Sequence, residues 1–180
     1  MKIGVYKFKR RYTAAQVIVD IMSAAAVVMQ VFIIIWHIQQ AADLDRMNHT
    51  DVVLHLEWYP LLIWLILSVA VFGVSIFLIV RKKKQPQKYT VTKNNVVKYC
   101  NIIDTCISCV RFMILVMLAD ISATHSFLIF GIFEFPTISV LSLLIIAGIF
   151  ILTRFRLEAI SEVEKENGEE TENKRSIVED

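Results

Sequence analysis

Charged residues of opposite sign lie inside the third apolar stretch of the chain, which runs from about Tyr99 to Ile121. Asp104, Ser108 and Arg111 follow one another at spacings of four and three residues, which places them on one face of a helix. A charge near the centre of a bilayer costs between about 3 and more than 10 kcal/mol, so such residues usually pair or line a polar cavity. This face therefore predicts a polar contact with another span.

The first apolar stretch, from Ala14 to Ile38, carries a similar stripe. Asp20 lies on one helix face with Ser23, Gln30 and His37, which follow one another at intervals of seven residues. We therefore expect spans one and three to face each other across a polar seam, made of Asp20, Ser23, Gln30, Asp104, Ser108 and Arg111. Two interpretations are open: a structural network that locks the spans together, in which Arg111 is a strut, or a functional site such as an ion or proton path.

Imidazole and carboxylate groups form a second candidate site on the predicted outer side of the membrane. Such groups suit Zn, Cu, Fe or Mn. The candidate ligands are His37, His49, His55, His125, Asp120 and Glu134. Their spacings match no recognisable metal motif, so the sequence leaves a metal site open, and we expect no cofactor.

Three cysteines lie in the third apolar stretch, and Cys106 and Cys109 have the spacing of a redox motif. Apolar surroundings raise the pKa of a thiol and suppress the reactive thiolate. We interpret Cys100, Cys106 and Cys109 as small packing residues. The chain has no pattern of a nucleophile with its base and no phosphate-binding loop, so we expect no enzymatic activity.

The elements that position these residues are four apolar blocks in a chain of 180 residues, of which 56% are hydrophobic. Each block approaches the roughly 20 residues that a bilayer-spanning helix needs. The sequence predicts an all-α integral membrane protein, an antiparallel four-helix transmembrane bundle. Its spans are expected at about residues 14–38, 61–80, 99–121 and 136–152 of a membrane domain that covers residues 1–157.

The distribution of Lys and Arg predicts the orientation in the membrane. Basic residues crowd the segment before the first span and the segment 81–98, whereas residues 39–58 and 122–135 are poor in them. Basic loops stay on the cytoplasmic side. We expect a multi-pass protein of the cell membrane, with an uncleaved signal anchor and with both termini in the cytoplasm.

Two segments beside the spans carry separate expectations. Phe127–Phe133 is too apolar for a loop in water, so it is expected to dip into the interface or to begin the fourth helix early. Residues 158–180 are expected to be an acidic cytoplasmic helix end, continuing to about Gly168, and then a disordered tail poor in apolar residues.

Several short segments are similar to a known pattern. They are Tyr89-Thr90, Asn94-Asn95, Val97-Lys98-Tyr99-Cys100 and Leu157-Glu158-Ala159-Ile160. Together with four spans and two cytoplasmic ends, they resemble an uncharacterised family of small four-span bacterial membrane proteins. The resemblance implies a bacterial origin and this topology, and it implies no reaction.

Three hypotheses for function follow. The first is a non-enzymatic accessory, immunity or regulatory subunit that acts through helix contacts with a membrane protein partner or a homo-oligomer. The alternative is a small oligomeric transporter or channel that uses Asp20, Asp104 and Arg111 as its path, and a second alternative is a membrane thiol redox enzyme. The expected partners include the lipid bilayer and exclude nucleic acid, because two short basic clusters beside a membrane offer too little basic surface.

Overall fold

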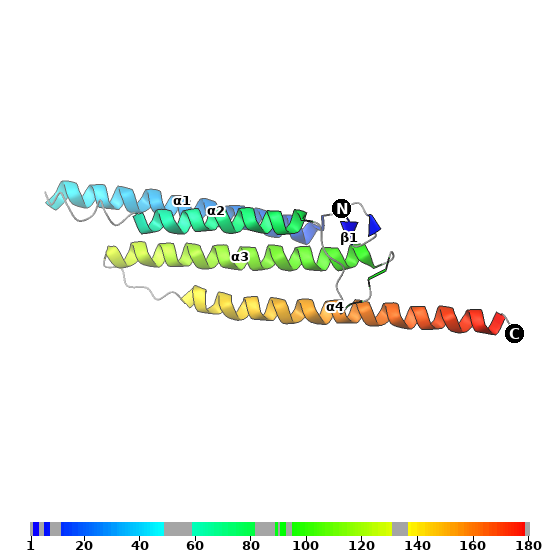
Figure 1. Cartoon of the computed structure of the whole chain (residues 1–180). Coiled ribbons are helices and arrows are strands. Elements are labelled where there is room, and N and C mark those ends of the chain that lie inside the picture. The colour runs from blue at the N-terminus through cyan, green and yellow to red at the C-terminus, as the bar shows by residue number, and fades with distance from the viewer. Residues whose placement is uncertain are drawn as a thin grey trace.

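The computed structural model describes residues 2–3, 6–7, 12–48, 59–81, 89, 91–92, 95–130 and 137–178. Four helices dominate it: α1 (Ala14–Asn48), α2 (Tyr59–Val80), α3 (Val96–Ile129) and α4 (Thr137–Val178) (Figure 1). Two short strands, β1 (Lys2–Ile3) and β2 (Tyr6–Lys7), pair antiparallel before α1. Each of the four helices contains a segment long and apolar enough to cross a membrane. The prediction of four membrane-length helices is therefore confirmed.

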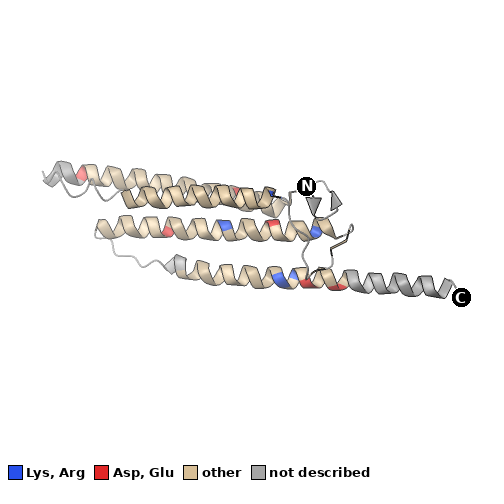
Figure 2. Ribbon diagram, in the orientation of Figure 1, with Lys and Arg blue, Asp and Glu red and all other residues tan. Residues whose placement is uncertain are grey.

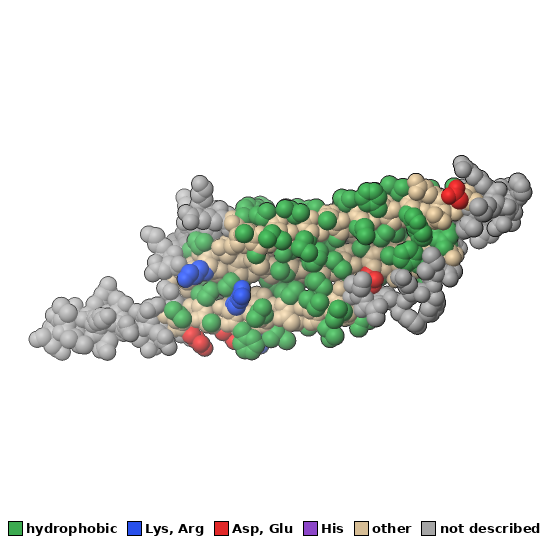
Figure 3. Space-filling model, turned by 180° about the vertical axis from the view of Figure 1, so that it is seen from behind, with side chains coloured by type: hydrophobic (Ala, Val, Ile, Leu, Met, Phe, Trp, Pro, Cys, Tyr) green, Lys and Arg blue, Asp and Glu red, His purple; other side chains and the backbone are tan. Residues whose placement is uncertain are grey.

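Few charged residues lie along the described lengths of the helices (Figure 2). Hydrophobic side chains cover much of the face drawn in Figure 3. Large apolar residues such as Ile21, Ile66 and Leu144 each leave more than half of their surface exposed. Such an exterior suits hydrocarbon, in which apolar side chains are the favourable outer surface.

Helix α3 is the centre of the fold. It packs against each of the other three helices, whereas α4 packs mainly on α3. Figure 1 shows α1 and α2 on one side of α3 and α4 on the other. Two hydrogen bonds join α1 to α3. The earlier residue of α1, Gln16, is bonded to the earlier residue of α3, Asn101, and the later residue His37 is bonded to the later residue Ser126. Helices α1 and α3 therefore run in the same direction.

Local sequence explains where the first helices begin. Thr13 and Gln16 cap α1 reciprocally, since the Thr13 N–H donates to Gln16 Oε1 (3.0 Å) and the Gln16 N–H donates to Thr13 Oγ1 (3.2 Å). Pro60 stands in the first turn of α2, where its missing N–H costs no hydrogen bond. Asn95 precedes α3, and its Oδ1 accepts the Thr92 N–H at 2.8 Å.

Two helix ends differ from those expected from the sequence. The residues Phe127–Ile129 belong to the last turn of α3, followed by the cap residue Phe130, so this part of the apolar segment neither begins α4 nor forms a loop. Residues 131–133 lie outside the described part. Helix α4 continues past Gly168 to Val178, where the sequence predicted disorder. The segment beyond Gly168 contains no proline and is rich in Glu, a good helix former.

Candidate functional site

The centre of the candidate site is an ion pair between α1 and α3. Arg111 is 2% exposed, and its Nη2 donates a hydrogen bond to Asp20 Oδ1. The side chain of Asp20 is 38% exposed, so the cation is the more deeply buried partner. Because Asp20 and Arg111 are 91 residues apart in the sequence, this pair is a tertiary contact that fixes α1 against α3.

The two other nitrogen atoms of Arg111 are also bonded. Its Nε donates to Ser23 Oγ on α1 at 3.3 Å, and its Nη1 donates to Ser75 Oγ on α2 at 3.4 Å. The two serine hydroxyls donate in turn to the carbonyls of Val19 and Phe72, both at 2.7 Å. Each serine is thereby oriented with its oxygen free to accept from the guanidinium. One side chain of α3 thus binds three helices together.

The Phe72 ring adds a further contact to the same guanidinium. Its centroid lies 4.7 Å from Cζ of Arg111, within the range of a cation–π interaction. Ser108, one turn before Arg111, donates to Asp20 Oδ1 at 3.3 Å. Asp104 is buried on the same face of α3 and is 1% exposed. The structure therefore brings four of the six seam residues into direct contact: Asp20, Ser23, Ser108 and Arg111.

The polar face of α1 is longer than the predicted seam. Gln16, Ser23, Gln30 and His37 follow one another at intervals of seven residues, and each is at most 2% exposed. A seven-residue repeat keeps one face of a helix against its neighbours, as in left-handed bundles. Here that repeat is polar, so the seam extends over the full apolar length of α1.

Gln30 differs from the other residues of this repeat. It is 1% exposed, and neither its Oε1 nor its Nε2 has a hydrogen-bond partner among the described residues. An amide buried without a partner carries a desolvation penalty of about 1–3 kcal/mol. The packing therefore does not explain why a polar side chain, rather than an apolar one, stands at Gln30.

Sequence reasoning missed contacts at both ends of the seam. At the start of α1, Gln16 Nε2 donates to the Asn101 carbonyl at 3.3 Å. Toward the other end, His37 Nδ1 and Ser126 Oγ form a hydrogen bond of 2.7 Å, whose direction depends on the histidine tautomer. The seven-residue spacing back from Ser23 and the Thr-x-x-Gln capping pattern were the signals that could have identified Gln16.

Aromatic rings pack against one another at the end of the seam where His37 lies. The Trp36 ring meets the rings of Phe127 and Phe130 edge to face, each with centroids 5.4 Å apart. The His37 ring lies 5.0 Å from that of Phe130. These contacts explain why the apolar residues after Ser126 stay with α3, since they bury their rings against α1.

The candidate metal ligands do not form a cluster within the described part of the chain, where no group of three His, Cys, Asp or Glu residues could hold an ion. His37 is bonded to Ser126, and His125 Nε2 is buried without a hydrogen-bond partner among the described residues. Asp120 lies on α3. His49, His55 and Glu134 are outside the described residues.

The three cysteines are all free thiols. Cys100 is buried in a small apolar cluster with Val91, Val96, Tyr99 and Leu157, which packs the end of the loop before α3 against α4. Cys106 and Cys109 are half-buried and line grooves beside α4. Two of the thiols are thus less enclosed than the sequence predicted.

No family model, no curated protein and no solved structure matches this chain.

Proposed function

We propose that this chain is a small, non-enzymatic integral membrane protein that works as an accessory, immunity or regulatory subunit through helix contacts inside the membrane. The four spans alternate in direction, and both termini lie in the cytoplasm. Two features support this topology. The colour gradients of successive helices in Figure 1 run in opposite directions, and the start of α1, the end of α2 and the start of α3, which the basic stretches of sequence adjoin, lie at the same end of the bundle.

The observation that carries this proposal is an uncovered strip of α3. Because α4 packs mainly on α3, a groove of about 480 Å³ remains between α2 and α4. On α3 it is lined by Ile107, Val110 and Ile114, with Arg111 of the seam beside them. Its α2 wall includes Ala70, Val74 and Ser75. Small residues such as Ala70 and Ser75 beside a groove allow the close approach of another helix in a membrane.

The polar seam supports the same proposal. All three nitrogen atoms of Arg111 are bonded inside the fold, so this charge acts as a strut between α1, α2 and α3. The seam then holds the three helices in the arrangement that leaves the groove open. Contact with a partner or a second copy takes place in this mainly apolar groove, beside the already bonded Arg111 and Ser75.

The test is co-purification from native membranes in mild detergent with the groove blocked. Val74→Trp fills the groove from α2, and Val69→Trp is the matched control, because both valines are 57% exposed but Val69 does not line the groove. We expect the wild type and Val69→Trp to retain a stoichiometric partner or a second copy, and Val74→Trp to lose it. A wild type that is monomeric and alone, or equal retention by both variants, contradicts the proposal.

Gln30 favours a second candidate function, a transporter or channel that uses the seam. A buried amide with both atoms unpartnered suits a site that holds a passing polar species. This function predicts ion or proton flux in proteoliposomes, and it predicts that Gln30→Met abolishes the flux without unfolding the protein. Absence of flux from the wild type against H⁺, Na⁺ and K⁺ gradients would remove this candidate.

A further inference from the structure

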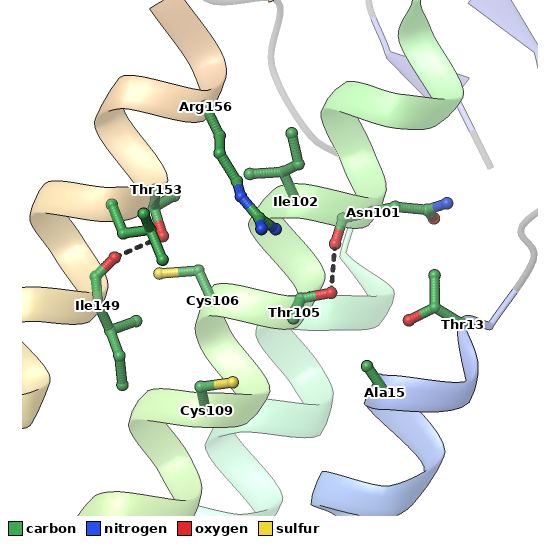
Figure 4. Close-up of a pocket in the computed structure, with 11 residues that line it drawn as sticks. Thr13, Ala15, Asn101, Ile102, Thr105, Cys106, Cys109, Ile149, Thr153 and Arg156 are labelled. Atoms are coloured by element: carbon green, nitrogen blue, oxygen red, sulfur yellow. Dashed lines mark hydrogen bonds between the residues drawn. The ribbon is translucent and has the colours of Figure 1, made fainter.

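A second groove, of about 330 Å³, lies where α4 crosses α3 close to the start of α1 (Figure 4). In this view Arg156, Thr153 and the apolar Ile102 lie in the upper part of the groove, and Thr13 lies at about the level of Cys106. Its lower part is lined by Cys109 and Ile149. The charged group of the groove therefore lies toward the end of the bundle where α1 begins, and apolar residues continue farther into the membrane-length region.

Arg156 is the charged residue of this groove. It is exposed, and Figure 4 shows its side chain reaching from α4 toward α3 across the mouth of the groove. It makes no hydrogen bond or ion pair with any residue that the structure describes, and no Asp or Glu lines the groove. Arg154, by contrast, donates from Nε to Glu158 Oε1 at 2.9 Å and does not line the groove.

The hydroxyl groups beside Arg156 are already used as donors. Thr105 Oγ1 donates to the Asn101 carbonyl, and Thr153 Oγ1 donates to the Ile149 carbonyl, both at 2.7 Å. The guanidinium is thus the strong donor left for a ligand. Its planar array of N–H groups matches the oxygens of a phosphate, which it can bind through two parallel hydrogen bonds.

The position of the groove decides which phosphate compound it fits. Arg156 lies seven residues before the end of the apolar segment Val140–Val163, about 10 Å along a helix. A ligand there has its polar group toward the cytoplasmic end of the bundle and its apolar part beside Ile149. Basic sites between helices at this level suit anionic lipid headgroups.

We propose that this groove binds one anionic phospholipid, with its phosphate at Arg156 and an acyl chain along Cys109 and Ile149. The groove between α2 and α4 adjoins this one at Cys106, which lines both, but Arg156 and Ile149 line only this groove. It requires the membrane orientation proposed above and no protein partner. A lipid without net negative charge keeps the apolar contacts but leaves the charge of Arg156 uncompensated.

The experiment is native mass spectrometry of the purified full chain titrated with phosphatidylglycerol or phosphatidylcholine. Arg156→Gln removes the proposed phosphate contact, and Arg154→Gln is the matched control, because it removes the same charge from the same helix outside the groove. We expect one tightly bound phosphatidylglycerol in the wild type and in Arg154→Gln. We expect about tenfold weaker binding in Arg156→Gln, which corresponds to the loss of one charge-assisted contact.

A second variant tests the apolar part of the site. Ile149→Trp fills the floor of the groove and is expected to weaken phosphatidylglycerol binding while Arg156 is intact. Thermal unfolding of each variant in detergent separates lost binding from lost folding. Equal binding of the two lipids by the wild type, or equal losses in Arg154→Gln and Arg156→Gln, would overturn the proposal. Full competition by inorganic phosphate would assign the site to the free anion and would overturn it as well.

Discussion

Arg111 illustrates how a single buried cation can be stabilised inside an apolar helix bundle. Its three nitrogen atoms are distributed among an aspartate and two serines, and an aromatic ring covers its guanidinium. In an apolar medium the loss of hydration is severe, and it is offset when every donor is bonded and an opposite charge is near. The side chain is therefore stable in place only while these partners remain.

Replacing Arg111 by Gln is expected to destabilise the fold strongly. The change leaves Asp20 without its counter-charge and the two serines without their donor, and breaking a buried pair from one side costs about 3–5 kcal/mol. Arg111→Lys keeps the charge but cannot reach three acceptors on three helices, so we expect an intermediate loss. Thermal unfolding in detergent, followed by circular dichroism, measures both.

A double-mutant cycle provides the control for this prediction. Asp20→Asn alone leaves a 2% exposed cation without its counter-charge, whereas Asp20→Asn combined with Arg111→Gln removes both charges. The double variant is expected to lose less stability than the sum of the two single variants. Additive losses would mean that the two residues do not stabilise each other.

Replacing Gln30 by Met is expected to raise stability, by about 1–3 kcal/mol, because the change removes a buried amide without partners and keeps the shape of the side chain. Unfolding temperature in detergent is again the measurement. A loss of stability would show that the amide is bonded in the membrane, by water or by a ligand. Gln39, which is exposed on the same helix, is the control position for the same change.

At the scale of the helices, spacing in the sequence indicated which face of α1 and of α3 is polar, and the structure pairs these faces. The spacing could not show that Ser75 of α2 completes the coordination of Arg111, because a serine in an apolar span is also typical of simple helix packing. It also could not show that Phe127 and Phe130 pack on Trp36. The hydropathy of two segments that are distant in the sequence does not indicate whether these segments contact each other.

The start of α1 depends on one side chain with two roles. Gln16 completes the reciprocal cap with Thr13 and donates to the Asn101 carbonyl of α3. Gln16→Ala removes both contacts, and we expect a loss of about 1–2 kcal/mol, of which the cap accounts for roughly 1. Gln39→Ala on the exposed face of α1 is the matched control and is expected to change stability little. Equal unfolding temperatures for the two variants would contradict this role of Gln16.

At the scale of the whole molecule, the arrangement is three helices joined by a polar seam, with α4 attached to the outer face of α3 (Figure 1). The sequence predicted a four-helix bundle in which a polar seam joins spans one and three, and it assigned no separate position to the fourth span. It could not distinguish the seam helices from α4 by hydropathy, since α3 and α4 have the same mean hydropathy of 2.1 in their most apolar windows. The difference lies in burial, which depends on packing and not on composition.

This difference predicts unequal local stability along the chain. Of the residues in the most apolar window, 28% are buried in α3 but only 11% in α4. Local opening of a helix costs less free energy when fewer tertiary contacts must break. Hydrogen–deuterium exchange in detergent, read by mass spectrometry, should therefore find the slowest exchange in α3 and faster exchange in α4 over the segment Val140–Val163.

Arg111→Gln should accelerate exchange in α1 and α2 more than in α4, because the guanidinium binds the first two helices and not the fourth. Uniform protection of all four helices would contradict the separate attachment of α4.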